Sequence, residues 1–110
     1  MTVTLIENFR AVFYAPFYAA FALEAFAAEG VDVRLKTSAQ PLETPNALAG
    51  GAGDVSWGGP MRVMRAYDED PNCGLVIFCE VVRRDPFFLI GREPLQEFRF
   101  PDLLDKKIAT

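Results

Sequence analysis

The stretch "AGDVSWGGP", residues 52–60, decides the fold that this sequence predicts. Residues 54–57 form a short β-type run that ends in the chain's single tryptophan. Two glycines and a proline follow at once; glycines permit a tight turn, and a proline suits the first turn of a helix. The stretch therefore predicts a strand, a turn and a helix in direct succession, as in α/β proteins.

The rest of the chain alternates in the same way. Strands are predicted for the apolar runs at residues 2–7, 31–37, 54–57 and 74–82. Helices are predicted at residues 17–29, 45–48 and 60–67, the second with Thr44 as its N-cap. This alternation predicts an α/β fold with an open, mainly parallel sheet and helices on both faces.

Individual patterns add detail to this fold. Residues 31–37, "VDVRLKT", alternate strictly between apolar and polar, which predicts a strand near the sheet edge. Residues 74–82, "GLVIFCEVV", are the longest apolar run and predict a central strand. Apolar side chains surround the helix at 17–29, so we expect it to be buried on more than one side and to end at Gly30. The C-terminal part is expected to contain a turn at 83–86, a loop with a helical turn at 94–105, and strands at 87–91 and 107–110.

Composition excludes several classes of function. The chain has 110 residues, enough for one domain, and a net charge of -4 with scattered basic residues, so we expect no nucleic-acid partner. No apolar run reaches the ~18 residues of a membrane span. The sequence contains no histidine, which excludes His-based metal sites and Ser-His-Asp triads within this chain. No catalytic residue, metal or cofactor is assigned; Glu7 and Glu80 lie near strand ends, but a lone carboxylate is weak evidence for catalysis.

The two cysteines are expected to be free. Cys73 and Cys79 fall on or beside one predicted strand, ~20 Å apart when extended, which is too far for a disulfide. We expect two buried thiols.

Open parallel sheets bind ligands beyond the carboxyl ends of their strands, and those ends supply the candidate site. The residues there combine aromatic rings, glycines and arginines, which suits a small anionic or aromatic ligand. The candidates are Asn8, Arg10, Phe13 and Tyr14 after the first strand, Ser38 after the second, Trp57, Gly58, Gly59 and Pro60 after the third, and Arg83 after the fourth.

Two interpretations of these residues are open. In the first, Gly58 and Gly59 let the backbone approach a ligand, the following helix start attracts an anion, and Trp57 is an apolar wall. In the second, the glycines are only a tight turn and Trp57 belongs to the core. Likewise, Arg10 either binds an anion or is a salt-bridged surface residue, and Arg83 either faces the ligand or pairs locally with Asp85.

Several segments, in order, carry a resemblance to a known family. The segments are Phe17-Tyr18, Glu29-Gly30-Val31-Asp32-Val33, the run from Leu48 to Asp54, and the run from Asp102 to Ile108. Their order and spacing resemble the NMT1/THI5-like periplasmic substrate-binding proteins over nearly the whole chain. One extra residue lies between Leu48 and Asp54, and Asp105 replaces a usual glycine; both departures fall in turns.

The resemblance implies a two-lobed protein that closes on its ligand. Residues 1–110 would be part of the N-terminal lobe of a type 2 periplasmic-binding-protein fold. The function implied is that of a solute-binding protein of an ABC import system, with a sulfonate, nitrate, taurine or a pyrimidine precursor as ligand and an ABC permease as partner. Arg10, Tyr14 and residues 57–60 match positions that contact ligand in this family.

Other interpretations stay open. The same fold also carries enzymes that act on small aromatic or carboxylic acids, such as decarboxylases and menaquinone-pathway enzymes. The last predicted strand looks interrupted, so the chain is expected either to belong to a longer protein or to be completed by a partner, for example as a homodimer. The location would be periplasmic if a signal peptide has been removed, and otherwise cytoplasmic.

Overall fold

A parallel three-stranded sheet forms the centre of the protein. The computed structural model describes residues 1–84 and 87–108. The strands are β1 (Thr2–Glu7), β2 (Asp32–Thr37) and β3 (Val55–Trp57), in the order β2-β1-β3. Both outer strands run parallel to β1. The expected α/β fold with a parallel sheet is thereby confirmed, and β2 lies at an edge as its alternating pattern predicts.

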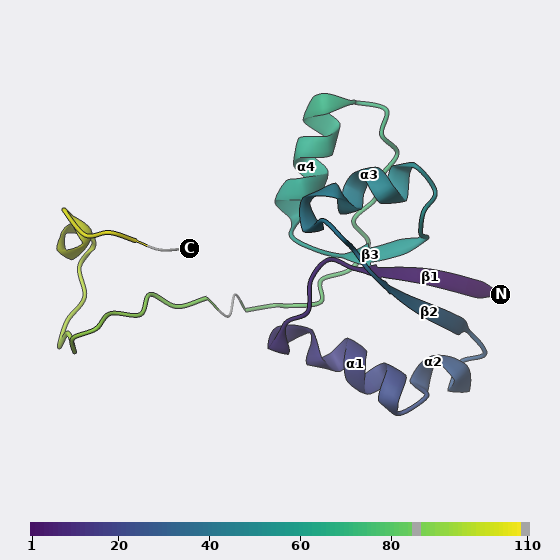
Figure 1. Ribbon diagram of the computed structural model, residues 1–110, viewed down its shortest axis with the longest axis horizontal. Helices are drawn as coiled ribbons and strands as arrows, with labels where there is room; N and C mark the ends of the chain where they lie inside the picture. The colour runs from purple at the N-terminus through teal and green to yellow at the C-terminus, as the bar shows by residue number, and fades with distance from the viewer. Residues whose placement is uncertain (85–86, 109–110) are drawn as a thin grey trace.

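Helices cover both faces of this sheet. Helices α1 (Ala15–Ala22) and α2 (Ala25–Ala28) lie on one side, and α3 (Thr44–Ala49) and α4 (Pro60–Glu69) on the other (Figure 1). The described residues also form three short 3-10 turns: η1 (Val12–Tyr14), η2 (Pro41–Glu43) and η3 (Phe100–Leu103). The last of these is the helical turn expected within residues 94–105. No helix in the described part of the chain is long and apolar enough to cross a membrane.

Successive residues of β1 point to opposite faces and so join different helices to the sheet. Leu5 points toward α1 and packs with Tyr14 and Trp57 in the buried core. Partly buried apolar side chains surround this core: Phe9, Ala11, Phe13, Phe17, Tyr18, Phe21, Val33, Leu35, Val55 and Val82. Ile6 is buried as well and lies beneath Gly53, at the turn that leads into β3. The aromatic residues after β1 therefore form much of the core on the α1 side.

The helix expected at residues 17–29 is two helices. The chain breaks at Leu23 and Glu24, where Glu24 takes a left-handed conformation with φ 53°. The break brings the ring of Phe26 against that of Phe21, with centroids 4.9 Å apart. Neither helix contains a buried residue, so the expectation of burial on several sides is wrong. Gly30 follows with φ 73°, the left-handed position at which a glycine stop was expected.

The strand expected at residues 74–82 is absent from the described structure. This segment has no regular secondary structure, and Val76, Ile77 and Phe78 are exposed. A strand needs a hydrogen-bonded neighbour, and no described backbone hydrogen bond joins the segment to the sheet. Residues 87–91 and 107–108 are likewise irregular. Residues 85–86 of the expected turn and residues 109–110 of the last expected strand lie outside the described residues.

The cysteines differ from expectation in their burial. Both Cys73 and Cys79 are free, as predicted. Neither is buried, because residues 74–82 do not enter the sheet: Cys73 is half-buried and Cys79 exposed.

Gly53→Ala tests the close packing of β3 on β1. A Cβ at Gly53 would lie 2.6 Å from Cδ1 and Cγ1 of Ile6. Because Ile6 is buried, we expect a loss of roughly 1–3 kcal/mol in the free energy of unfolding, the usual cost of overpacking. Urea denaturation measures this loss. The matched control is Gly59→Ala, since a Cβ at Gly59 meets nothing within 4 Å. Equal stability of the two variants would contradict the packing described here.

Candidate ligand-binding site

The carboxyl ends of the three strands meet at one edge of the sheet. In the strand register, Glu7 lies beside Thr37 on β2 and beside Trp57 on β3. A cavity of about 730 Å³ opens beside β3 and reaches this edge. Seven of the ten candidate residues line it: Phe13, Tyr14, Trp57, Gly58, Gly59, Pro60 and Arg83. The other three, Asn8, Arg10 and Ser38, are not among its lining residues.

Aromatic rings form one wall of the cavity. Trp57 is 3% exposed, and the ring of Phe17 stacks on it at a centroid distance of 4.2 Å and an interplanar angle of 20°. Tyr14 lies 5.3 Å from the same indole. Trp57 is thus a core residue that also lines the cavity, so the two interpretations of the tryptophan are compatible.

Two buried donors at this edge have no partner among the described residues. They are Nδ2 of Asn8 and Nε1 of Trp57. Thr44 donates from Oγ1 to Oδ1 of Asn8 at 3.2 Å, whereas the amide nitrogen of Asn8 has no described acceptor. A Cβ at Gly58 would lie 3.5 Å from that nitrogen, so the donor lies directly behind a cavity-lining glycine. An unsatisfied buried donor costs about 1–3 kcal/mol, so both groups favour any state that supplies an acceptor.

Glu7 is a fully buried carboxylate whose hydrogen bonds link three parts of the fold. It is 0% exposed and accepts bonds from Thr37 at 2.6 Å, Tyr18 at 3.0 Å and Arg10 at 3.1 Å. The bond from Thr37 is the largest cause that lowers the pKa of Glu7, and it outweighs the opposing effect of burial. Burial, followed by the bond to Glu7, raises the pKa of Tyr18, which keeps its phenol protonated as a donor. Glu7 is therefore a structural acceptor in this arrangement and not a free base.

Arg10 and Ser38 have local partners that explain their places. The Arg10 guanidinium pairs with Glu7 and lies 5.7 Å from the centre of the Tyr18 ring, while most of its side chain is exposed. Of its two interpretations, the salt-bridged one describes this structure. Ser38 donates its amide to the carbonyl of Glu7 and its hydroxyl to the carbonyl of Gln40, both at 2.9 Å. The partner considered for Arg83, Asp85, lies outside the described residues.

Sequence reasoning missed several cavity residues. Thr44 was expected to cap a helix, but α3 begins at Thr44 with Glu43 as its N-cap, and the Thr44 hydroxyl bonds Asn8 instead. Arg62 lines the cavity from the first turn of α4, with Nη1 3.7 Å from the position of a Gly58 Cβ. Arg62 follows Pro60, the first residue of α4, by two positions. This position in the first turn of the predicted helix could have indicated that Arg62 lies near the candidate site. Leu75–Val82, expected in the sheet, line the cavity as well.

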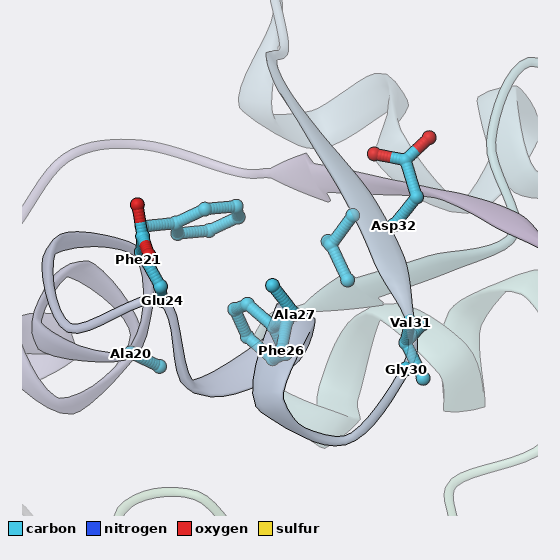
Figure 2. A pocket seen from close by; sticks show the side chains of 9 residues that line it. Ala20, Phe21, Glu24, Phe26, Ala27, Gly30, Val31 and Asp32 are labelled. Atoms are coloured by element: carbon cyan, nitrogen blue, oxygen red, sulfur yellow. The ribbon is translucent and has the colours of Figure 1, made fainter.

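A second cavity lies at the other end of β2. It measures about 420 Å³ and lies between the α1–α2 break and the first residues of β2 (Figure 2). Phe21 and Phe26 contribute apolar surface, and Glu24 and Asp32 are its acidic residues. Asp32 accepts a hydrogen bond from Thr2 at 2.7 Å. Because this cavity lies away from the strand carboxyl ends, it does not join the candidate site.

Glu7→Gln tests the role of the buried carboxylate. A pKa below the ordinary value of 4.5 means that Glu7 stabilises the fold above that pH. This contribution is lost as the pH falls through the lowered pKa of the folded state. We expect Glu7→Gln to cost ~2 kcal/mol at neutral pH, since one charge-assisted acceptor is replaced by an amide.

Urea denaturation from neutral to acidic pH measures this effect. The difference between wild type and Glu7→Gln should narrow toward acid pH, where the wild-type carboxyl is also neutral. Glu29→Gln, at an exposed position, is the control. A difference that is independent of pH would contradict a buried, ionised Glu7.

Comparison with known proteins supports a binding role. The chain is 26% identical over 104 residues to the Bacillus subtilis (strain 168) protein named "Putative binding protein YtlA". The alignment covers 94% of this chain and 31% of that protein, so the chain spans less than a third of its relative's length. No protein-family model matches the chain, and no solved structure matches it significantly. The similarity is thus to a binding protein, and membership of the NMT1/THI5-like family stays a prediction.

Proposed function

We propose that this chain is part of the N-terminal lobe of a two-lobed solute-binding protein, and that it binds a small anionic or heteroaromatic ligand at the carboxyl edge of its sheet. The observation that carries the proposal is the cavity at the β3–α4 junction, with Trp57, Gly58 and Gly59 in its lining. Parallel sheets place ligands at such junctions. The similarity to a longer protein that is named as a binding protein supports the placement of this chain within a larger binding protein.

The aromatic lining favours a ligand with a flat or apolar body. Phe13, Tyr14, Phe17 and Trp57 all face the cavity. Stacked or edge-on aromatic contacts contribute about 0.5–1.5 kcal/mol each beyond the burial of area. Trp57 also offers Nε1, a buried donor without a described partner, which an acceptor on the ligand ring would satisfy.

The charges around the cavity favour an anionic group. Its charged lining residues are Arg62, Arg83 and Glu80, two cations and one anion. Helix α4 begins beside them with Gly59 as N-cap, no side-chain cap and no acidic residue in its first turn. The positive end of a ten-residue helix therefore faces this region without an internal counter-charge. A carboxylate, sulfonate or nitrate complements this field, and the amide of Asn8 lies next to Gly58 to supply a further donor.

The partners follow from this role. A receptor of this kind would deliver its ligand to an ABC permease, and its place would be the periplasm. Sulfonates, taurine, nitrate and pyrimidine precursors are the ligand classes to test first. Its action needs no covalent chemistry, because the attraction of both lobes to the ligand is enough to favour the closed state.

Trp57 makes the proposal directly measurable, since it is the single tryptophan of the chain. We expect its fluorescence to change on titration with benzenesulfonate, taurine, nitrate or a hydroxymethylpyrimidine. Benzyl alcohol, which has an aromatic ring and no charge, should bind at least about tenfold more weakly than benzenesulfonate if an anion is recognised. No change with any of these four compounds would overturn the proposed ligand class, and equal binding of benzyl alcohol would overturn the recognition of an anion.

Gly58→Ala tests the position of the site. Its added methyl makes only ordinary contacts with Asn8 and Arg62, at 3.5 and 3.7 Å, so we expect the free energy of unfolding to change by less than about 0.5 kcal/mol. The same methyl narrows the approach to the Asn8 amide, so affinity for the best ligand should fall about tenfold or more. Gly91→Ala, outside the cavity, is the matched control. Unchanged affinity in Gly58→Ala would place the site elsewhere.

A further inference from the structure

The space beside Gly58 is bounded by two nitrogen atoms that donate hydrogen bonds. A Cβ added at Gly58 would lie 3.5 Å from Nδ2 of Asn8 and 3.7 Å from Nη1 of Arg62. Apart from the adjoining residues, these are the described heavy atoms within 4 Å of that position. Amide and guanidinium nitrogens donate and do not accept. The missing side chain of Gly58 therefore leaves an opening between Gly58, Asn8 and Arg62, here called the Gly58 cradle, with two donors and no described acceptor around it.

Asn8 is held in the orientation that places its amide nitrogen at the Gly58 cradle. The residue is 1% exposed, and its Oδ1 accepts a hydrogen bond from Oγ1 of Thr44 at 3.2 Å. Nδ2 is buried and has no described acceptor. Buried donors are nearly always hydrogen-bonded in native proteins, so this nitrogen requires an acceptor from outside the described chain. The unpaired amide thus points to a bound acceptor independently of any charge.

Arg62 is the cation best placed to recognise an anion at the Gly58 cradle. It lies in the first turn of α4, is half-buried and lines the cavity. Its charge reaches the buried wall of the cavity: burial raises the pKa of Tyr14, and the positive charge of Arg62 opposes that rise. Arg83 also lines the cavity but is exposed, where solvent and salt screen its charge more strongly.

The backbone at the start of α4 adds few hydrogen-bond donors to this region. Pro60, the first residue of the helix, has no amide hydrogen. The amide of Arg62 already donates to the carbonyl of Gly59 at 3.2 Å. The helix end therefore contributes its positive dipole more than individual hydrogen bonds. Recognition of a particular ligand group depends on the side chains of Asn8 and Arg62.

We propose that Asn8 and Arg62 form an oxyanion subsite at the Gly58 cradle, which binds a ligand end that only accepts hydrogen bonds, such as a carboxylate or sulfonate. This inference rests on the proposed function and narrows it: Arg62 is the specificity-determining cation, and Asn8 is the specificity-determining neutral donor. An amide end offers one acceptor and one donor, so one nitrogen of the cradle would face another donor. Sites built from such groups discriminate strongly against analogues that leave them unpaired.

Benzoate and benzamide are matched probes of this subsite, because they share a ring and a planar end group and differ by one oxygen replaced by NH₂. We expect the chain to bind benzoate at least about tenfold more tightly than benzamide, as measured by titration of Trp57 fluorescence. Arg62→Gln should weaken benzoate binding by at least about tenfold and change benzamide binding by less than about threefold. Arg65→Gln is the matched control and should bind like the wild type, because Arg65 lies on the same helix, pairs with Glu69 at 2.7 Å and is outside the cavity lining.

Asn8→Asp supplies a readout that a damaged fold would not produce. The carboxylate keeps an oxygen for Thr44 and replaces the donor by a charged acceptor, so the preference should change from benzoate to benzamide. Thermal unfolding shows whether each variant is folded, and the comparison of the two probes on the wild type decides without any variant. Equal affinity of the wild type for both probes would overturn the subsite. Benzoate binding that survives Arg62→Gln would overturn the subsite alone, whereas a wild type that binds no anion would overturn the proposed function as well.

Discussion

The hydrogen bonds of the buried Glu7 carboxylate are the constraint on which the arrangement of this protein depends. A carboxylate without solvent exposure must have donors, because an uncompensated buried charge is very costly. Its donors come from three separate places: Thr37 at the end of β2, Tyr18 on α1, and Arg10 in the loop after β1. One side chain therefore sets where β2 ends, how α1 lies on the sheet and how the aromatic loop leaves β1. Phe13, Tyr14 and Phe17 follow that loop, so the position of the Trp57 wall depends on it too.

Asn8, the residue after Glu7, lies on the other face of the sheet and is only partly hydrogen-bonded. Glu7 is satisfied by three donors, whereas Asn8 has one bond from Thr44 and a buried amide nitrogen without a described acceptor. Consecutive strand residues point to different faces, so the end of β1 provides a fixed scaffold on the α1 side and an unfilled hydrogen-bonding group on the side of α3 and α4. Buried donors in native proteins are nearly always hydrogen-bonded, so the Asn8 amide is a group that an acceptor on a ligand or a water would satisfy. This contrast supports the proposed site near Gly58 more strongly than the exposed Arg10 does.

Local patterns predicted the α/β unit well and failed where distant contacts decide. β1 begins and ends at the predicted residues, and β2 and α3 agree within one residue or so, because apolar spacing and helix-starting prolines are local signals. The break at Glu24 was missed because a left-handed glutamate is locally unfavourable and is held by the contact of Phe26 with Phe21. The cavity beside β3 is lined by several of the candidate residues that follow the strand ends, and their role in binding stays a prediction. Some side-chain partners depend on tertiary geometry, which no local sequence pattern indicates. Examples are the partners of Arg10 and Ser38 and the bond from Thr44 to Asn8.

The segment at residues 74–82 shows how strand propensity and strand formation differ. Its composition is more strand-like than that of β3, yet β3 is a strand and the segment is not. β3 has β1 beside it and supplies only three residues to the ladder. The longer run has no backbone hydrogen bond to a neighbouring strand among the described residues, and its carbonyl at Leu75 accepts instead from the Tyr67 hydroxyl at 2.8 Å, so it stays irregular. A sheet grows only where a free edge and an extended segment meet in register, since each added residue loses backbone entropy that ladder bonds and side-chain burial must offset. In the described residues no strand pairs with the outer side of β3, and residues 75–82 line the same cavity as Val55 and Ser56 without a ladder bond to them. Strand propensity alone therefore does not extend the sheet.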